Sequence, residues 1–410
     1  MLAQRPVSAT RGWIVLVGFV AFVASLFLAR HSFMLDPVKG AALVILITAA
    51  THFFLDVTVL KVHRRTSTGL DWTKKNSSFD RVQTKIFGFA GSLGFIGAIY
   101  WLFPEYRGDF YDSYWSILRL TLPVVGLLAI PYIWFVDSRM ENPNDGYVQM
   151  GRVVLFQWEK IDKAVLGQHM LGWLVKGFFL PLMFTYFVRD LAEFSTFDFS
   201  IITDFKTFFD FTYHSIFLVD VGIVSMGYVM SLRLFDTHLR STEPTFKGWL
   251  VALICYQPFW SLFGRLYLDY SSDFGWGVWL QAYPAMYAIW GSLILLLYAV
   301  YVTSSLMFGC RFSNLTHRGI LTNGPYAWSK HPAYISKNIA WWLTSVPFAM
   351  SGSGADALRG CALLALINYV YYLRAKTEEA HLARDPVYRE YTAWIAERGL
   401  IARLRNRFGD

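Results

Sequence analysis

Long apolar runs, separated by short polar or aromatic connections, dominate the chain from residue 12 to residue 373. A membrane core of roughly 30 Å is crossed by about 20 apolar residues in a helix, and most runs approach that length. The pattern therefore predicts an all-α, polytopic membrane protein with about ten spans. We expect them at residues 12–29, 40–60, 86–103, 115–135, 165–188, 215–232, 249–263, 278–303, 339–350 and 358–373.

The ninth run is too short to be interpreted as an independent span. Residues 339–350 cannot cross the hydrocarbon core as a regular helix. We expect this segment either to tilt or to form a tight hairpin with the tenth run around residues 351–354. The hairpin returns the chain to the membrane face that it left.

The distribution of Lys and Arg residues over the loops predicts how the chain is oriented in the membrane. The N-terminus and the even-numbered loops contain 20 Lys and Arg residues, against 6 in the odd-numbered loops. Cytoplasmic loops are the basic ones, so both termini are predicted to be cytoplasmic. The expected location is a bacterial inner membrane, with the loop at residues 323–334 and the C-terminal tail on the cytoplasmic face.

Composition agrees with a membrane protein. The 410 residues are 55% hydrophobic and 16% charged, whereas soluble domains contain about 25% charged residues. The net charge of +8 reflects topology and favours contact with anionic lipid headgroups. Because the basic residues are spread over membrane-proximal loops, we do not expect nucleic-acid binding.

We divide the chain into two parts. Residues 1–275 form an N-terminal transmembrane region of about seven spans and unassigned role. Residues 276–410 contain most of the polar motifs and end in a cytoplasmic tail.

The first motif lies in the loop before residue 339. Gly324-Pro325-Tyr326 disfavours a continuous helix and leaves backbone groups free to contact a ligand. In the following His331-Pro332-Ala333-Tyr334, Pro332 suits the first turn of a helix, so His331 is expected near its N-cap. A helix start of this kind favours a carboxylate or another anion. Each piece alone is also compatible with an ordinary interfacial loop.

The second motif follows the tenth run by about one helical turn. Neighbouring residues on a helix diverge by about 100°, so Glu378 and Glu379 cannot perform the same task. We expect one carboxylate to bind hydroxyl or amino groups of a ligand, and the other to pair with Arg374. A solvated helix start is the simpler alternative.

Ionisable residues within spans are costly to bury. His52 and Asp56 share a face of the second span, and Arg119, Lys176 and Asp220 lie in or near later spans. They either line a polar cavity or form interhelical pairs. No spacing typical of a metal site or of a soluble nucleotide-binding fold occurs.

Together these motifs resemble the isoprenylcysteine carboxyl methyltransferase family and its phospholipid N-methyltransferase relatives. The shared pattern is a Gly-Pro-Tyr turn, a basic residue with His-Pro-x-Tyr, a helical hairpin, then Arg-x-x-x-Glu-Glu-x-x-Leu and a tail with tyrosines. Here it covers about residues 278–398, including Lys330, Leu382, Tyr388 and Tyr391. Lys330 replaces the usual Arg, and residues 335–338 differ from the apolar turn common in the family.

The resemblance implies a membrane-embedded enzyme that uses S-adenosylmethionine to methylate a lipid or lipid-linked carboxylate, thiol or amine. The implied catalytic residues are Arg374, which orients the acceptor, and Glu378. The implied cofactor-binding residues are Gly324, Pro325, Tyr326, His331, Pro332, Tyr334, Glu378 and Glu379. Methyl transfer to such nucleophiles depends mainly on alignment, so no dedicated base is expected.

Two alternatives stay open. A sterol-type membrane reductase also binds its nicotinamide cofactor, NADPH, in a C-terminal region. A transporter or scaffold could retain the helical arrangement without catalysis, and the intramembrane charges are compatible with it.

Overall fold

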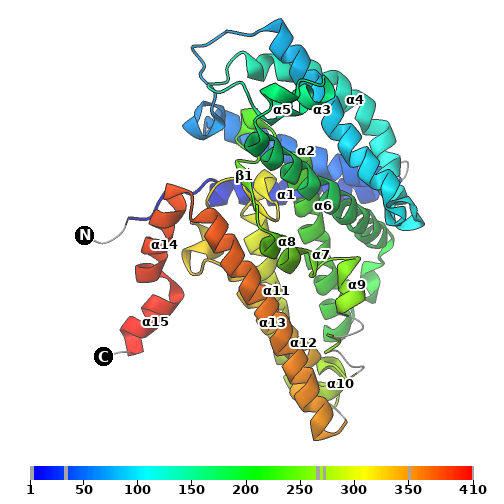
Figure 1. Cartoon of the computed structure of the whole chain (residues 1–410). Helices are drawn as coiled ribbons and strands as arrows, with labels where there is room; N and C mark the ends of the chain where they lie inside the picture. The colour runs from blue at the N-terminus through cyan, green and yellow to red at the C-terminus, as the bar shows by residue number, and fades with distance from the viewer. Residues whose placement is uncertain (1–3, 32–35, 265–267, 271–273, 350–351, 409–410) are drawn as a thin grey trace.

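The computed structural model describes residues 4–31, 36–264, 268–270, 274–349 and 352–408, and helices dominate it (Figure 1). The α-helices are α1 (Gly12–His31), α2 (Pro37–Thr58), α3 (Phe79–Leu102), α4 (Asp112–Asp137), α5 (Gly146–Val154), α6 (Lys163–Thr196), α7 (Phe205–Val229), α8 (Phe246–Leu253), α9 (Phe259–Phe263), α10 (Trp276–Leu280), α11 (Pro284–Leu306), α12 (Pro332–Ser345), α13 (Gly354–Leu382), α14 (Pro386–Arg398) and α15 (Leu400–Phe408). Two short strands, β1 (Ser241–Thr242) and β2 (Thr316–His317), pair antiparallel.

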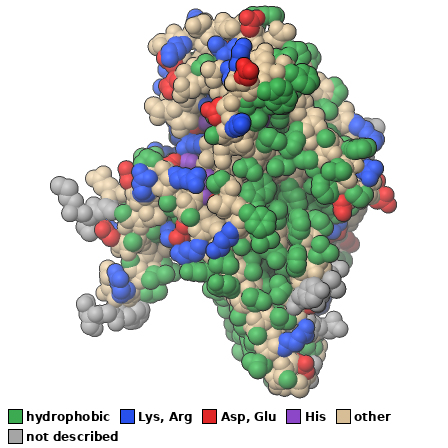
Figure 2. Space-filling model, viewed as in Figure 1, with side chains coloured by type: hydrophobic (Ala, Val, Ile, Leu, Met, Phe, Trp, Pro, Cys, Tyr) green, Lys and Arg blue, Asp and Glu red, His purple; other side chains and the backbone are tan. Residues whose placement is uncertain are grey.

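Within the described residues, seven helices are long and apolar enough to cross a membrane: α1, α2, α3, α4 with its preceding turn, α6, α7 and α11. They correspond to the first six predicted spans and the eighth. Figure 2 shows hydrophobic side chains over a broad, continuous area of this helical body. The prediction of an all-α, polytopic integral membrane protein is confirmed.

The other three predicted spans take different forms. The run at residues 249–263 is not one helix but two short ones, α8 and α9. Pro258 supplies no amide for a helical hydrogen bond and crowds the preceding turn, which accounts for the interruption. Helices α12 and α13 form the expected hairpin (Figure 1). They are joined by contacts such as the indole of Trp342 donating to Asn368 at 2.7 Å.

Two apolar clusters hold the body together. One joins α1, α2, α6 and α7 and includes the tilted ring pair of Phe22 and Phe187. The other joins α7, α10, α11 and α12 around Tyr298 and Trp276. Helix α7 belongs to both clusters, so it links the N-terminal spans to the C-terminal hairpin.

Helix α6 has 34 residues, roughly 50 Å at 1.5 Å per residue, and contains Pro181. A proline inside a helix leaves the carbonyl four residues earlier without its amide donor. Here that carbonyl belongs to Gly177, and the hydroxyl of Tyr100 on α3 donates to it at 2.7 Å. A tertiary contact therefore replaces the missing backbone bond.

None of the five ionisable residues predicted in or near spans lines the cavity of the candidate site, and two of them, Asp56 and Asp220, contact polar side chains of other elements. Asp56 lies 3.7 Å from Arg311, and Asp220 accepts a hydrogen bond of 2.6 Å from Tyr301. Lys176 lies over the ring of Trp173 on its own helix. The ring of His52 is buried against Gly18 and Gly309, where an added Cβ would clash or be crowded. Arg119 is exposed on α4.

Candidate functional site

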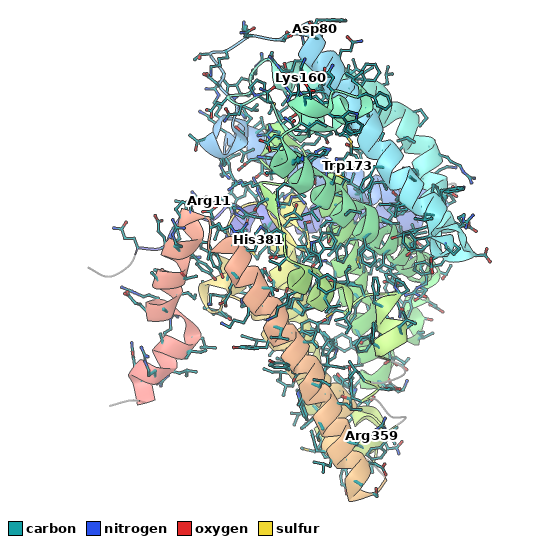
Figure 3. The ribbon with its side chains drawn as sticks, viewed as in Figure 1. Arg11, Asp80, Lys160, Trp173, Arg359 and His381 are labelled. Atoms are coloured by element: carbon teal, nitrogen blue, oxygen red, sulfur yellow. The ribbon has the colours of Figure 1, made fainter. Side chains whose placement is uncertain are left out.

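A polar cavity lies where the ends of α11 and α13 and the start of α12 meet the loops around β1 and β2. From the two predicted motifs, it is lined by Tyr326, Lys330, His331, Tyr334, Arg374 and Glu378. His381, at one end of α13, also lines it, whereas Arg359 marks the opposite end of that helix (Figure 3). The structure thus brings together motifs about 50 residues apart.

The loop before α12 owes its shape to Gly324 and Pro325. Gly324 has φ of +57°, and a Cβ there would lie 2.9 Å from the sulfur of Met307, so another residue would be strained. Pro325 begins a short 3-10 turn over Gly324–Ala327. Neither residue lines the cavity, and together they place the side chain of Tyr326 in its wall.

Both ends of the chain brace this loop. The side-chain amide of Asn323 donates to the Thr10 carbonyl at 3.0 Å, and the Ser8 hydroxyl donates to the side-chain oxygen of Asn323 at 2.9 Å. From α14, the Tyr391 hydroxyl donates to the Tyr326 carbonyl at 2.7 Å. Figure 1 shows the two chain ends on the same side of the body.

The start of α12 confirms the predicted capping arrangement. His331 is the N-cap residue and Pro332 occupies the first turn. One turn later, the Tyr334 ring stacks on the His331 ring, with centroids 5.5 Å apart. The Tyr334 hydroxyl donates to Glu378 on α13 at 2.9 Å. Pro332 shapes the backbone and lies outside the lining.

The two glutamates diverge as expected. Glu378 faces the cavity beside Tyr334. Glu379 lies outside the lining and accepts from Lys330 at 2.7 Å, from His331 at 3.0 Å and from Lys376 at 3.1 Å. The expected pairing of one glutamate with Arg374 is wrong, because side chains on the α12 side occupy both.

Charge-assisted hydrogen bonds join Glu379 to Lys330, His331 and Lys376. Burial acts to raise the pKa of Glu379, but hydrogen bonds from His331, Lys330 and Lys376 outweigh it, and the pKa lies well below the ordinary carboxyl value. Glu379 is therefore ionised at neutral pH, and it fixes Lys330 and His331 at the edge of the cavity.

We predict that Glu379→Gln lowers the free energy of unfolding by about 2 kcal/mol at pH 7, since charge-assisted hydrogen bonds are lost. Because the folded pKa lies below the unfolded value of about 4.3, this stabilisation is present above that value. It is lost as the pH falls through the folded pKa. Unfolding in mixed detergent micelles at several pH values measures it, with the exposed Glu390→Gln as the control. A difference that grows in acid would contradict the assignment.

Arg374 is held differently from the prediction. Its guanidinium donates to the Asn314 side-chain oxygen at 2.6 Å and to the Tyr256 hydroxyl at 3.4 Å. The rings of Tyr256, Tyr334 and Tyr371 lie 5.2–5.9 Å from it. Among the described residues, no carboxylate forms an ion pair with this buried guanidinium, so its charge is available to a ligand.

Several lining residues were not predicted from the sequence, among them the polar residues Asn314, Tyr256 and Glu243. Asn314 also donates to Tyr228 and Tyr256, so it connects Arg374 to α7 and to the loop after α8. The only sequence signal for Tyr256 was the polar break that follows it, Gln257-Pro258, inside an apolar run.

The position of Glu243 in the cavity wall could not be predicted, because β1 and β2 are too short to be recognised in the sequence. The strand pair aligns Thr242 with Thr316, and the Glu243 amide donates to the Leu315 carbonyl at 2.8 Å. One carboxylate oxygen accepts from Thr245, and the other lies 4.0 Å from His381. The N-terminal region thus supplies part of the cavity wall.

Comparison with known proteins bears on the C-terminal part of the chain. No curated protein and no solved structure matched the chain. Residues 286–384 match the model of the isoprenylcysteine carboxyl methyltransferase (ICMT) family, which is less than half of the chain. That segment contains both motifs, from Gly324 to Leu382, and excludes Tyr256 and Glu243. Over residues 286–384, the C-terminal part of this chain is therefore similar to the isoprenylcysteine carboxyl methyltransferase family, a family of membrane methyltransferases.

Proposed function

We propose that this protein transfers a methyl group from S-adenosylmethionine to a lipid or lipid-linked acceptor, and that the acceptor nucleophile is an anion. The observation that carries the proposal is the cavity shared by Tyr326, His331, Tyr334, Arg374 and Glu378. All five residues lie within the segment that matches the methyltransferase family.

The side chains suit the parts of S-adenosylmethionine. Glu378 could accept hydrogen bonds from ribose hydroxyls or the amino group, and Lys330 and His331 offer positive charge or donors to the carboxylate. The rings of Tyr326 and Tyr334 provide faces for adenine or for the sulfonium cation. Gly324, Pro325, Pro332 and Glu379 would act indirectly, by shaping the loop and fixing Lys330 and His331.

The volume of the cavity sets a condition on cofactor binding. The cavity has a volume of about 120 Å³, below the range of roughly 300–1,000 Å³ common for small-molecule sites. Binding of a nucleoside cofactor therefore requires side chains at the cavity mouth to move. Tyr334 is a candidate, because it joins α12 to α13 through the single hydrogen bond to Glu378.

The charge in the cavity favours an anionic acceptor. Lys337, one turn after Tyr334, lies over the rings of Tyr301 and Trp341, at 4.8 and 5.3 Å. Like Arg374, it forms no ion pair with a carboxylate among the described residues. Two cations in a half-buried space repel an ammonium and attract a carboxylate. This favours a carboxylate over an amine.

The residues would act mainly by positioning. When bound, the cofactor supplies an electrophilic methyl group and a neutral thioether leaving group. A carboxylate acceptor is already ionised at neutral pH, so no proton must be removed before attack. Arg374 and Lys337 would hold the acceptor oxygen, and Glu378 and Tyr334, each one helical turn away on α13 and α12, would hold the cofactor. Alignment of this kind accounts for large rate effects.

The proposed reaction takes place at one face of the membrane. The excess of Lys and Arg in the loops on this side supports a position of the cavity on the cytoplasmic face of a bacterial inner membrane, where the cofactor would be supplied. The acceptor would reach the cavity from the lipid phase beside α12 and α13.

The direct test uses purified protein and a total lipid extract. We expect calorimetric binding of S-adenosylmethionine and none of NADPH, followed by transfer of a labelled methyl group to lipid. Alkali releases the label as methanol from a methyl ester, but not from an N-methyl or S-methyl product. Binding of NADPH without S-adenosylmethionine would support a reductase. An alkali-stable label would overturn the carboxylate acceptor.

Lys337→Met should raise the KM for the lipid acceptor by about tenfold, the effect of losing roughly 1.4 kcal/mol of charge interaction. The affinity for S-adenosylmethionine should change little. Methionine keeps an unbranched side chain, one atom shorter, against Tyr301 and Trp341, and Lys247→Met in an exposed position of α8 is the control. An unchanged KM would remove Lys337 from acceptor binding.

A further inference from the structure

The last helix has an apolar face that points away from the protein. In α15, Leu400, Ile401 and Leu404 are 51%, 82% and 45% exposed, whereas Ala402 is 6% exposed. At 100° per residue, the three large side chains lie within about 100° of one another, and Ala402 projects from the other side. Figure 1 shows α14 and α15 as an arm that stands apart from the helical body.

The remaining surface of α15 is basic. Arg403, Arg405 and Arg407 are all exposed, and Leu400–Phe408 contains no acidic residue. An apolar face bordered by arginines is typical of helices that lie in a membrane interface. Arginines at this position are attracted to anionic headgroups, which are found on the cytoplasmic leaflet.

Helices α14 and α15 also contact the loop that precedes Lys330 and His331. The Leu400 amide, at the start of α15, donates to the Trp328 carbonyl at 2.8 Å. In α14, the Tyr391 hydroxyl donates to the carbonyls of Tyr326 and Ser329 at 2.7 and 3.2 Å. The position of α15 is thus transmitted through backbone contacts to residues that adjoin Lys330 and His331.

We propose that α15 is an interfacial anchor for anionic lipid, and that its binding to the membrane surface stabilises the Gly324–Ser329 loop in its ligand-binding form. The anchoring rests on the proposed cytoplasmic orientation, and the effect on the loop rests on the proposed function. The partner is a bilayer surface with phosphate headgroups, because Leu400, Ile401 and Leu404 need an apolar layer directly beneath those charges.

Anchoring is tested on the full chain in nanodiscs of phosphatidylcholine alone or with about 30% phosphatidylglycerol. Trypsin cleavage after Arg403 and Arg405 is followed by mass spectrometry without any cofactor. We expect cleavage about tenfold slower in the anionic discs. The double variant Ile401→Gln/Leu404→Gln should lose this protection, while Val387→Gln, an exposed apolar position of α14, should retain it.

Equal cleavage in the two lipids would overturn the anchor, as would protection that survives in the double variant and points to an acidic protein partner. Protection that appears only at high protein density would indicate a second copy and also overturn it. Since this readout needs no cofactor, it is independent of the proposed function.

The effect on the loop has its own readout. Dissociation constants for S-adenosylhomocysteine are compared in the same two nanodiscs. We expect several-fold tighter binding by the wild type in anionic lipid and no lipid dependence for Ile401→Gln/Leu404→Gln. Unchanged affinity in the wild type would overturn the coupling and leave the anchor standing. Absence of binding in both lipids would count against the proposed function and remove the coupling with it.

Discussion

Arg374→Lys is expected to lower the rate of methyl transfer by about two orders of magnitude, while the affinity for S-adenosylmethionine stays within about threefold. Lysine retains the charge but not the planar set of donors with which Arg374 contacts Asn314 and Tyr256. The ammonium would be free to move within the tyrosine rings, and displacement by about 1 Å can cost a hundredfold in rate.

Single-turnover transfer of a labelled methyl group, with calorimetry on the same samples, measures this effect. Arg359→Lys makes the same change at the opposite, exposed end of α13 (Figure 3) and should be silent. If Arg374→Lys lost cofactor affinity and rate equally, Arg374 would belong to the cofactor site and not to acceptor orientation.

Glu378→Gln is expected to weaken binding of S-adenosylmethionine by about thirtyfold. A hydrogen bond to a charged group contributes about 1.5–3 kcal/mol, and a tenfold change corresponds to about 1.4 kcal/mol. Glutamine has the same shape and can still accept from Tyr334, so loss of charge is separated from loss of packing.

The control for this variant is its neighbour. Glu379→Gln should reduce stability, as argued above, with a smaller effect on cofactor affinity because Glu379 lies outside the cavity lining. If Glu379→Gln weakened binding of S-adenosylmethionine more than Glu378→Gln does, the roles proposed for the two glutamates would have to be exchanged. Isothermal titration at a temperature where both variants are folded decides between them.

Much of this architecture could be predicted from local patterns. The length of the apolar runs gave six spans and the eighth, and Pro332 gave the start of α12. The divergence of Glu378 and Glu379 followed from helix geometry alone. These features depend on neighbouring residues, so they are visible in a single sequence.

The partners of Arg374 could not be predicted, because they depend on contacts across the fold. Arg374 was expected to pair with a glutamate one turn away, but Asn314 and Tyr256 hold it instead. Tyr256 belongs to an apolar run that was predicted as one span, and Pro258 divides it. Glu243 reaches the cavity only through the two-residue strand pair, which is too short to produce a recognisable pattern.

The hydrogen bonds that join Asn323 to Ser8 and to the Thr10 carbonyl also constrain the order in which the protein can fold. These partners are separated by more than 300 residues, so the N-terminal segment leaves the ribosome long before the loop that it supports. The contacts between this segment and the loop can form only after the intervening spans have been synthesised, and Tyr391 of α14 is added later still. The Gly324–Ser329 loop is therefore among the last parts of the molecule to form.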